Sequence, residues 1–217
     1  MKILVLAGDH WHSHDILFEG LDNAFSELGW DADFYLSHDV IAWNELSKYN
    51  VFILAQWGKI KYDDSSEENR WMKPELEEKI ASYVEGGGGF IAFHSALSDH
   101  STLGIYRKIS KGHFLFHPEK LQMITIDKQA ISHPISSGIE QFSILDEQYF
   151  VEVDENDTDI ILNGSSTSGR SHICWAHQHG LGRVCALTPG HTKNVLAHPT
   201  IKKLICNAVL WCADKPV

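Results

Sequence analysis

Four consecutive glycines and the short apolar run that follows them constrain the fold of this chain most strongly. The glycines, Gly86–Gly89, end a helical pattern, and Phe90–Phe93 follows as an apolar segment that stops at His94 and Ser95. Glycine commonly ends a helix because it adopts a left-handed backbone conformation without a Cβ clash. A short, uniformly apolar run is typical of a strand buried on both faces of a sheet. Because ligands of open α/β sheets bind where such strands end, we predict that His94 marks the floor of a site.

Strand-like and helix-like segments alternate through the first part of the chain. The predicted strands are Lys2–Ala7, Asp31–Leu36, Val51–Ala55 and Phe90–Phe93, and the predicted helices are Asp15–Leu28 and Pro74–Glu85. This alternation predicts an α/β fold with a doubly wound, mostly parallel sheet and helices on both faces.

The second part of the chain reads as strands and a closing helix. The predicted elements are strands at Leu121–Ile126, Phe142–Val153 and Asp159–Asn163, a flexible segment at Gly164–Gly169, an added β-hairpin of Ile173–Ala176 and Gly182–Leu187, and a helix at Val195–Trp211. No linker or composition break divides the sequence, so we expect one domain over residues 1–217.

The charge balance disfavours two classes of partner. Asp and Glu number 29 against 18 Lys and Arg, a formal net charge of −11. An acidic protein is poorly suited to nucleic acid or an anionic membrane as its main partner. No apolar run approaches the roughly 20 residues that span a bilayer. The first residues read as a strand and not as a signal peptide, so we expect a cytoplasmic protein. The four cysteines form no CxxC pair and read as buried free thiols.

Histidines and carboxylates carry the candidate chemistry. The exit of the glycine-led strand resembles a nucleophile elbow, but His94 stands in the nucleophile position and Ser95 after it is expected to point elsewhere. A Ser-His-Asp hydrolase therefore fits poorly, and no cysteine near this strand allows a Cys-dependent glutaminase. The 14 histidines include an alternating set, His10, His12 and His14, that an extended segment would present on one side. Histidines with acids can bind a divalent metal, act as general acid and base, or do both.

Several motifs resemble those of a known family. They are Ser-His-Asp-Ile at 13–16, Gly-Gly-Gly-Phe-Ile-Ala-Phe-His-Ser-Ala at 87–96, Phe-His-Pro at 116–118, His-Pro-Ile-Ser-Ser-Gly at 133–138, Asp-Glu-Gln-Tyr at 146–149, Trp-Ala-His-Gln-His-Gly-Leu-Gly-Arg-Val at 175–184 and Pro-Gly-His-Thr at 189–192. In this order, over nearly the whole chain, they resemble the ThuA-like family, named for a trehalose-utilisation protein.

The resemblance implies a flavodoxin-like fold of the class I glutamine amidotransferase-like type, in which the usual nucleophilic Cys is replaced. It also implies a role in sugar metabolism, on disaccharides or their oxidised keto derivatives. The positions that match the family's motifs are His14, His94, His117, Asp146, Glu147, Tyr149 and His191.

Two hypotheses follow for function. In the first, the protein is a carbohydrate-processing enzyme whose partner is a small-molecule sugar. Its expected catalytic residues are His94, Glu147, His191 and Asp146, its expected substrate-binding residues are Tyr149, Trp57 and His14, and its expected ligands for a divalent metal such as Zn²⁺ are His94, His117 and Glu147. In the second, a fold without its nucleophilic Cys keeps the pocket for sugar binding or regulation. Both leave open whether the chain forms a homo-oligomer.

Overall fold

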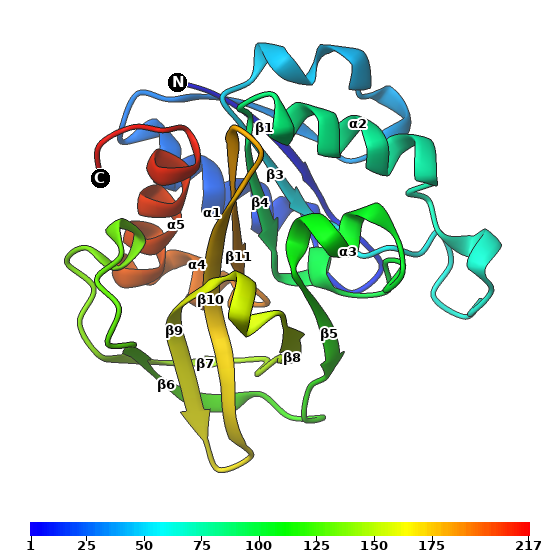
Figure 1. The fold of residues 1–217 in the computed structure, drawn as a ribbon. Coiled ribbons are helices and arrows are strands. Elements are labelled where there is room, and N and C mark those ends of the chain that lie inside the picture. Colours follow the sequence, from blue (N-terminus) through cyan, green and yellow to red (C-terminus); the bar gives the residue numbers. More distant parts are fainter.

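A nine-stranded sheet forms the centre of the computed structural model, which describes residues 1–217 (Figure 1). Its strands are β1 (Lys2–Ala7), β2 (Asp31–Tyr35), β3 (Val51–Ala55), β4 (Gly89–Phe93), β6 (Gln122–Lys128), β7 (Phe142–Asp146), β9 (Asp159–Ser166), β10 (Gly169–His179) and β11 (Gly182–Leu187). They lie in the order β2-β1-β3-β4-β11-β10-β9-β6-β7.

The sheet is mostly parallel, as predicted. The pairs from β2 to β11 are all parallel, and the pairs from β11 to β7 are all antiparallel. As a result, only β10 and β6 run against the other strands. The first five strands follow the flavodoxin-like order, in which ligands bind where the strand order reverses, between β1 and β3.

Helices cover both faces of the sheet (Figure 1). On one face lie α1 (His14–Ser26), α4 (Lys193–Ala197) and α5 (Pro199–Cys212), and on the other lie α2 (Pro74–Glu85) and α3 (Ile105–Ser110). Side chains alternate along a strand, so Ile3 and Val5 of β1 join the core under α1 and α5, whereas Leu4 and Leu6 join the core under α2. None of these helices has the length and apolar character needed to cross a bilayer.

The prediction of a single strand at Phe142–Val153 is wrong, because this segment contains two strands that belong to two different sheets. After β7 the chain leaves the large sheet, and β8 (Phe150–Val153) pairs with β5 (Gly112–Phe116) in a small antiparallel sheet. The departure begins at Asp146, whose buried carboxylate accepts hydrogen bonds from the backbone N–H groups of Gly190 and His191. Asp146 is thus the last residue of β7, and Glu147 follows the strand.

Two further expectations are corrected at turns. The predicted helix Val195–Trp211 is two helices, α4 and α5, separated by His198, because the residue before a proline is driven out of the helical region. The segment Gly164–Gly169 is not a flexible link: β9 and β10 extend into it and leave only Thr167 and Ser168 between them.

A strained turn follows β4, at the position where the sequence resembles a nucleophile elbow. His94 has φ +47°, a left-handed conformation that is uncommon for a residue with a side chain. A short 3₁₀ helix, His94–Leu97, starts at this residue. Opposite it lies Gly190, with φ +155°, where an added Cβ would lie 2.5 Å from the ring of Phe93 and 3.4 Å from Cβ of His94. Close packing of Gly190 on Phe93 therefore helps to hold His94 in its left-handed conformation.

The variant Gly190→Ala tests this packing. We expect it to lower the free energy of unfolding by roughly 2 kcal/mol or more, since both the steric clash and the positive φ oppose a side chain. The matched control is Gly29→Ala, because Gly29 also has a positive φ, +65°, but no atom within 4 Å of an added Cβ. The control should lose about 1 kcal/mol in urea unfolding. Equal losses in the two variants would show that contact with Phe93 is unimportant.

A buried histidine on β10 predicts acid sensitivity. Burial is the main cause that lowers the pKa of His177 from 6.5 to about 3, and the charges of Lys111 and His179 lower it further. Because the unfolded chain takes up the proton first, stability is complete above pH 6.5 and falls as the pH drops from 6.5 towards 3. When the pH falls from 7 to 5, His177 should cost the unsubstituted protein about 2 kcal/mol of unfolding free energy. The variant His177→Leu lacks this histidine, so its unfolding free energy should fall by about 2 kcal/mol less over the same pH range. Urea titrations at the two pH values measure this difference, and parallel losses in both proteins would refute it.

Candidate metal centre

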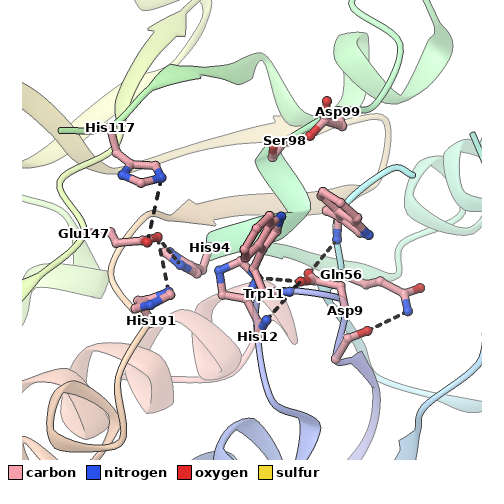
Figure 2. Close-up of polar contacts among 12 residues, drawn as sticks. Asp9, Trp11, His12, Gln56, His94, Ser98, Asp99, His117, Glu147 and His191 are labelled. Carbon is pink, nitrogen blue, oxygen red and sulfur yellow. Dashed lines mark hydrogen bonds and ion pairs between the residues drawn. The ribbon is translucent and has the colours of Figure 1, made fainter. Parts of the chain in front are cut away.

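Four side chains converge at the carboxyl edge of the sheet. His12 follows β1, His94 follows β4, Glu147 follows β7 and His191 follows β11. These four strands run in the same direction, so the residues after them meet at one edge. One ligand atom from each residue lies within 4.8 Å of the others. Figure 2 shows three histidines, His94, His117 and His191, directed at Glu147.

The imidazole of His94 is oriented by a backbone carbonyl. Its Nδ1 lies 2.6 Å from the carbonyl oxygen of Thr188, just beyond β11, and must donate its hydrogen to that oxygen. The side chain is 1% exposed. Burial is the largest cause that lowers the pKa of His94 to about 4, so the ring is neutral near pH 7. Nε2 therefore carries a lone pair, and this buried atom has no hydrogen-bond partner.

A carboxylate orients His12 in the same way. Asp9 Oδ1 accepts a hydrogen bond from His12 Nδ1 at 2.7 Å and from the backbone N–H groups of Trp11 and His12. Asp9 Oδ2 accepts one from the backbone N–H of Trp57. Burial by itself raises the pKa of Asp9, but His12 and these backbone donors outweigh it and hold the pKa below its ordinary value. Because Nδ1 is committed to Asp9, the buried and unpartnered Nε2 of His12 is the atom left for a ligand.

The third histidine is positioned through its backbone. Asp146 accepts hydrogen bonds from the N–H groups of Gly190 at 2.9 Å and His191 at 3.2 Å. Burial raises the pKa of Asp146 to about 7, partly offset by these donors. The Nδ1 atom of His191 is buried without a hydrogen-bond partner, and burial lowers the pKa of this ring.

Glu147 is the acidic member of the cluster. Its Oε2 lies 3.2 Å from His191 Nδ1 and 3.5 Å from His94 Nε2, and its Oε1 lies 3.7 Å from His117 Nε2. Burial raises the pKa of Glu147, but the three histidines, His94 first, outweigh it and lower the pKa below its ordinary value. The group is therefore ionised at neutral pH.

This donor set fits a divalent metal ion. Three buried imidazole nitrogens have no hydrogen-bond partner, and one ionised carboxylate lies among them. Imidazole and carboxylate are ordinary zinc ligands, and ligand histidines commonly donate their other N–H to a carboxylate or a carbonyl, as His12 and His94 do. The cluster of His12, His94, Glu147 and His191 could hold such an ion.

Three of the four cluster residues, His12, Glu147 and His191, line a cavity of about 490 Å³. His94, predicted to mark the floor of the site, is buried in the cluster and does not line the cavity. The residues that line the cavity are Trp11, His12, Trp57, Ser95, Ser98, Asp99, Phe114, His117, Glu147, Tyr149 and His191. None of them is Lys or Arg. Ser95 was expected to point elsewhere, but it lines the cavity, and its buried Oγ has no hydrogen-bond partner. This volume falls within the range of roughly 300–1,000 Å³ that is usual for small-molecule sites.

The structure brings together most of the residues that the sequence nominated. His94, Glu147 and His191 are in the four-residue cluster, and Trp57 and Tyr149 line the cavity. The ring of Tyr149 stacks on that of His94 with centroids 4.3 Å apart. Asp146 is fully buried and does not line the cavity, so its contacts are those of a positioning residue.

Two nominated residues lie elsewhere than expected. His117 lines the cavity beside Glu147 but is not in the four-residue cluster. Its Nδ1 donates a hydrogen bond to the carbonyl oxygen of Pro118. His14 begins α1, pairs with Asp15 and does not line the cavity. The expected ligand set of His94, His117 and Glu147 therefore differs from the cluster that the fold assembles.

Sequence reasoning named His12 only as one of three alternating histidines and did not nominate it as a site residue. Spacing placed His10, His12 and His14 on one side of an extended segment, but the segment is a turn closed by hydrogen bonds between Asp9 and His12. That turn directs only His12 into the cluster. The signal in the sequence was the acid three residues before the histidine.

Comparison with known proteins now gives the family. The family model ThuA, described as "Trehalose utilisation", matches residues 2–212. The chain belongs to the ThuA family. Comparison with curated proteins found no match.

Solved structures share the ThuA fold at low sequence identity. A ThuA-like protein from Parabacteroides merdae has a TM-score of 0.80 and 17% identity, covering 100% of this chain and 91% of that one. A protein from Salmonella typhimurium LT2 described as cytoplasmic has a TM-score of 0.74 and 15% identity, covering 98% and 99%. A β-galactosidase from Rahnella sp. R3 has a TM-score of 0.66 and 11% identity, with 99% of this chain matching 31% of that enzyme. At these identities the likeness shows the fold alone.

Replacement of Asp9 tests how the centre is held. We expect Asp9→Asn to weaken Zn²⁺ binding by roughly 10–100-fold, the usual effect of losing a carboxylate that orients a ligand histidine. Titration against a competing chelator measures the affinity. The control is Asp15→Asn, because Asp15 pairs with His14 on the surface of α1. If both variants bound Zn²⁺ as the unsubstituted protein does, Asp9 would have no role in holding the centre.

Proposed function

We propose that this ThuA-family protein is an enzyme of carbohydrate metabolism that acts on a disaccharide or a keto-sugar. The observation that carries the proposal is the convergence of three unpartnered imidazole nitrogens on ionised Glu147, with His12, His191 and Glu147 in the wall of a cavity. The family's description, trehalose utilisation, supports a sugar as the substrate. A cytoplasmic location, as described for the Salmonella relative, belongs to the same proposal.

The cavity has the surface chemistry that an uncharged sugar needs. Aromatic side chains of Trp11, Trp57, Phe114 and Tyr149 supply apolar walls. On the wall formed by the 3₁₀ helix and the loop after it, Asp99 accepts a hydrogen bond from Ser98 at 2.9 Å and pairs with Lys59 at 2.9 Å. The Ser98 hydroxyl oxygen and the remaining lone pairs of the carboxylate can meet sugar hydroxyl groups. No Lys or Arg lines the cavity, and the nearby Lys59 is neutralised by its ion pair with Asp99, which disfavours a phosphorylated substrate.

Glu147 is suited to the role of general base. It is ionised, 15% exposed and directed into the cavity. Its Oε2 lies beside the nitrogens of His94 and His191 that would share a metal ion, so its Oε1 is the oxygen left to take a proton from a sugar hydroxyl group or a water molecule. His117, 33% exposed and 3.7 Å from Glu147, lies where it can pass that proton towards solvent. The residues suited to hold a divalent ion are His12, His94, Glu147 and His191. Such an ion, when bound, would polarise a carbonyl or hydroxyl oxygen of the sugar.

Replacing the carboxylate tests the proposed chemistry. We expect Glu147→Gln to lower turnover at least 100-fold, within the range of losses seen when a general base is removed. Turnover is measured on a panel of disaccharides and keto-sugars, and metal content is measured by elemental analysis. The matched control is Glu19→Gln, because Glu19 pairs with Lys193 on the surface.

The outcomes separate the two hypotheses for this family member. Loss of turnover in Glu147→Gln, with the control unchanged, supports the enzyme. Stabilisation by sugars without turnover across the panel would instead support a non-catalytic sugar-binding module. Unchanged turnover and unchanged metal content in Glu147→Gln would remove this residue from the chemistry.

A further inference from the structure

An exposed aromatic surface adjoins the cavity, and only Trp11 of its three residues belongs to the cavity wall described above. Trp11 is 61% exposed and Tyr62 is 54% exposed. His10 lies between them, stacked on Tyr62 with ring centroids 4.2 Å apart and edge-on to Trp11 at 4.5 Å. We call these three residues the aromatic rim. Aromatic rings gathered on a surface in this way commonly mark a binding site.

The rim continues the wall of the cavity outwards. Trp11 lines the cavity itself, whereas His10 and Tyr62 do not. The ring of His10 is also nearly parallel to that of Trp57, which lines the cavity, at 6.3 Å. The rim and the cavity therefore form one surface that is longer than the cavity alone. It lies over the loops after β1 and β3, where the strand order reverses and α/β folds bind ligands.

Both loops of the rim are held in place by buried polar groups. Asp9 accepts hydrogen bonds from the backbone N–H groups of Trp11 and Trp57 at 3.0 and 3.1 Å. In the other loop, buried Asn69 accepts a hydrogen bond from the N–H of Lys61 and donates to the carbonyl oxygens of Lys61 and Asp64 on either side of Tyr62. A rim fixed before binding loses little conformational entropy on meeting a ligand.

We propose that the aromatic rim is a subsite for the second ring of a disaccharide whose first ring occupies the cavity. This inference rests on the proposed function and specifies its substrate as a two-ring sugar. The apolar C–H faces of a sugar ring stack on aromatic side chains, and its hydroxyl groups remain in water at an exposed rim. A nucleotide would also stack there, but no Lys or Arg lines the cavity, and Lys59, which lies over the Trp57 ring, is already paired with Asp99 at 2.9 Å.

The experiment compares one-ring and two-ring sugars. Calorimetric titration measures the dissociation constants of glucose, trehalose, maltose, sucrose and cellobiose. We expect at least one disaccharide to bind five- to tenfold more tightly than glucose, a ratio that matches roughly one stacking interaction. Tyr62→Ala should abolish that ratio and leave glucose affinity unchanged, because Tyr62 does not line the cavity. Trp11→Ala should lower disaccharide affinity more than glucose affinity. The control is Leu181→Ala, because Leu181 is 77% exposed on the turn between β10 and β11.

Each outcome decides the inference. Loss of the disaccharide preference in Tyr62→Ala, with the control unchanged, supports the subsite. The subsite is overturned if no disaccharide binds more tightly than glucose, or if Tyr62→Ala weakens both classes of sugar equally. Failure of the proposed function would look different: Glu147→Gln would keep full turnover, whatever the rim variants did to sugar affinity.

Discussion

The hydrogen bond from His94 Nδ1 to the carbonyl oxygen of Thr188 is the contact on which the site depends. It joins the ends of β4 and β11, two neighbouring parallel strands, and fixes which nitrogen of the buried ring carries the hydrogen. Left-handed His94 and the close approach of Gly190 make this contact possible, because together they turn the chain sharply at the strand end. A strained elbow thus presents a bare Nε2 atom, where an α/β hydrolase would present a nucleophile.

The other two histidines of the cluster, His12 and His191, are also held by a buried polar group that accepts N–H hydrogen bonds. Asp9 does this for His12, and Asp146 does it for the backbone of His191. Buried acids are costly unless they are hydrogen-bonded, and Asp9 accepts four N–H hydrogen bonds and Asp146 two. Asp9 also holds Trp11 and Trp57, so one carboxylate links the geometry of the candidate metal centre to the aromatic wall of the cavity.

Many of the strands and site residues were predictable from the sequence, and the predictions that failed did so for physical reasons. Uniform apolar runs marked β1, β3 and β4, and the strand ends marked His94 and His191. Some failures were local, because Asp9 stands three residues before His12 and Pro199 follows the end of α4, so both signals were in the sequence. Others depended on contacts between residues far apart in the sequence. The local turn at Asp9 brings in His12 and leaves out His14, whereas the contact of Asp146 with Gly190, 44 residues away, ends β7 early. Ser95 and the rim around Tyr62 likewise gain meaning only when distant loops come together.

The metal-bound state offers the most direct test of the donor set. X-ray absorption spectroscopy of the protein loaded with Zn²⁺ reports the number and type of atoms bound to the ion. We predict one ion per chain with three imidazole nitrogens and one carboxylate oxygen at about 2.0–2.2 Å. A shell of oxygen atoms alone, or a shell that is unchanged when His12 is replaced by alanine, would contradict it.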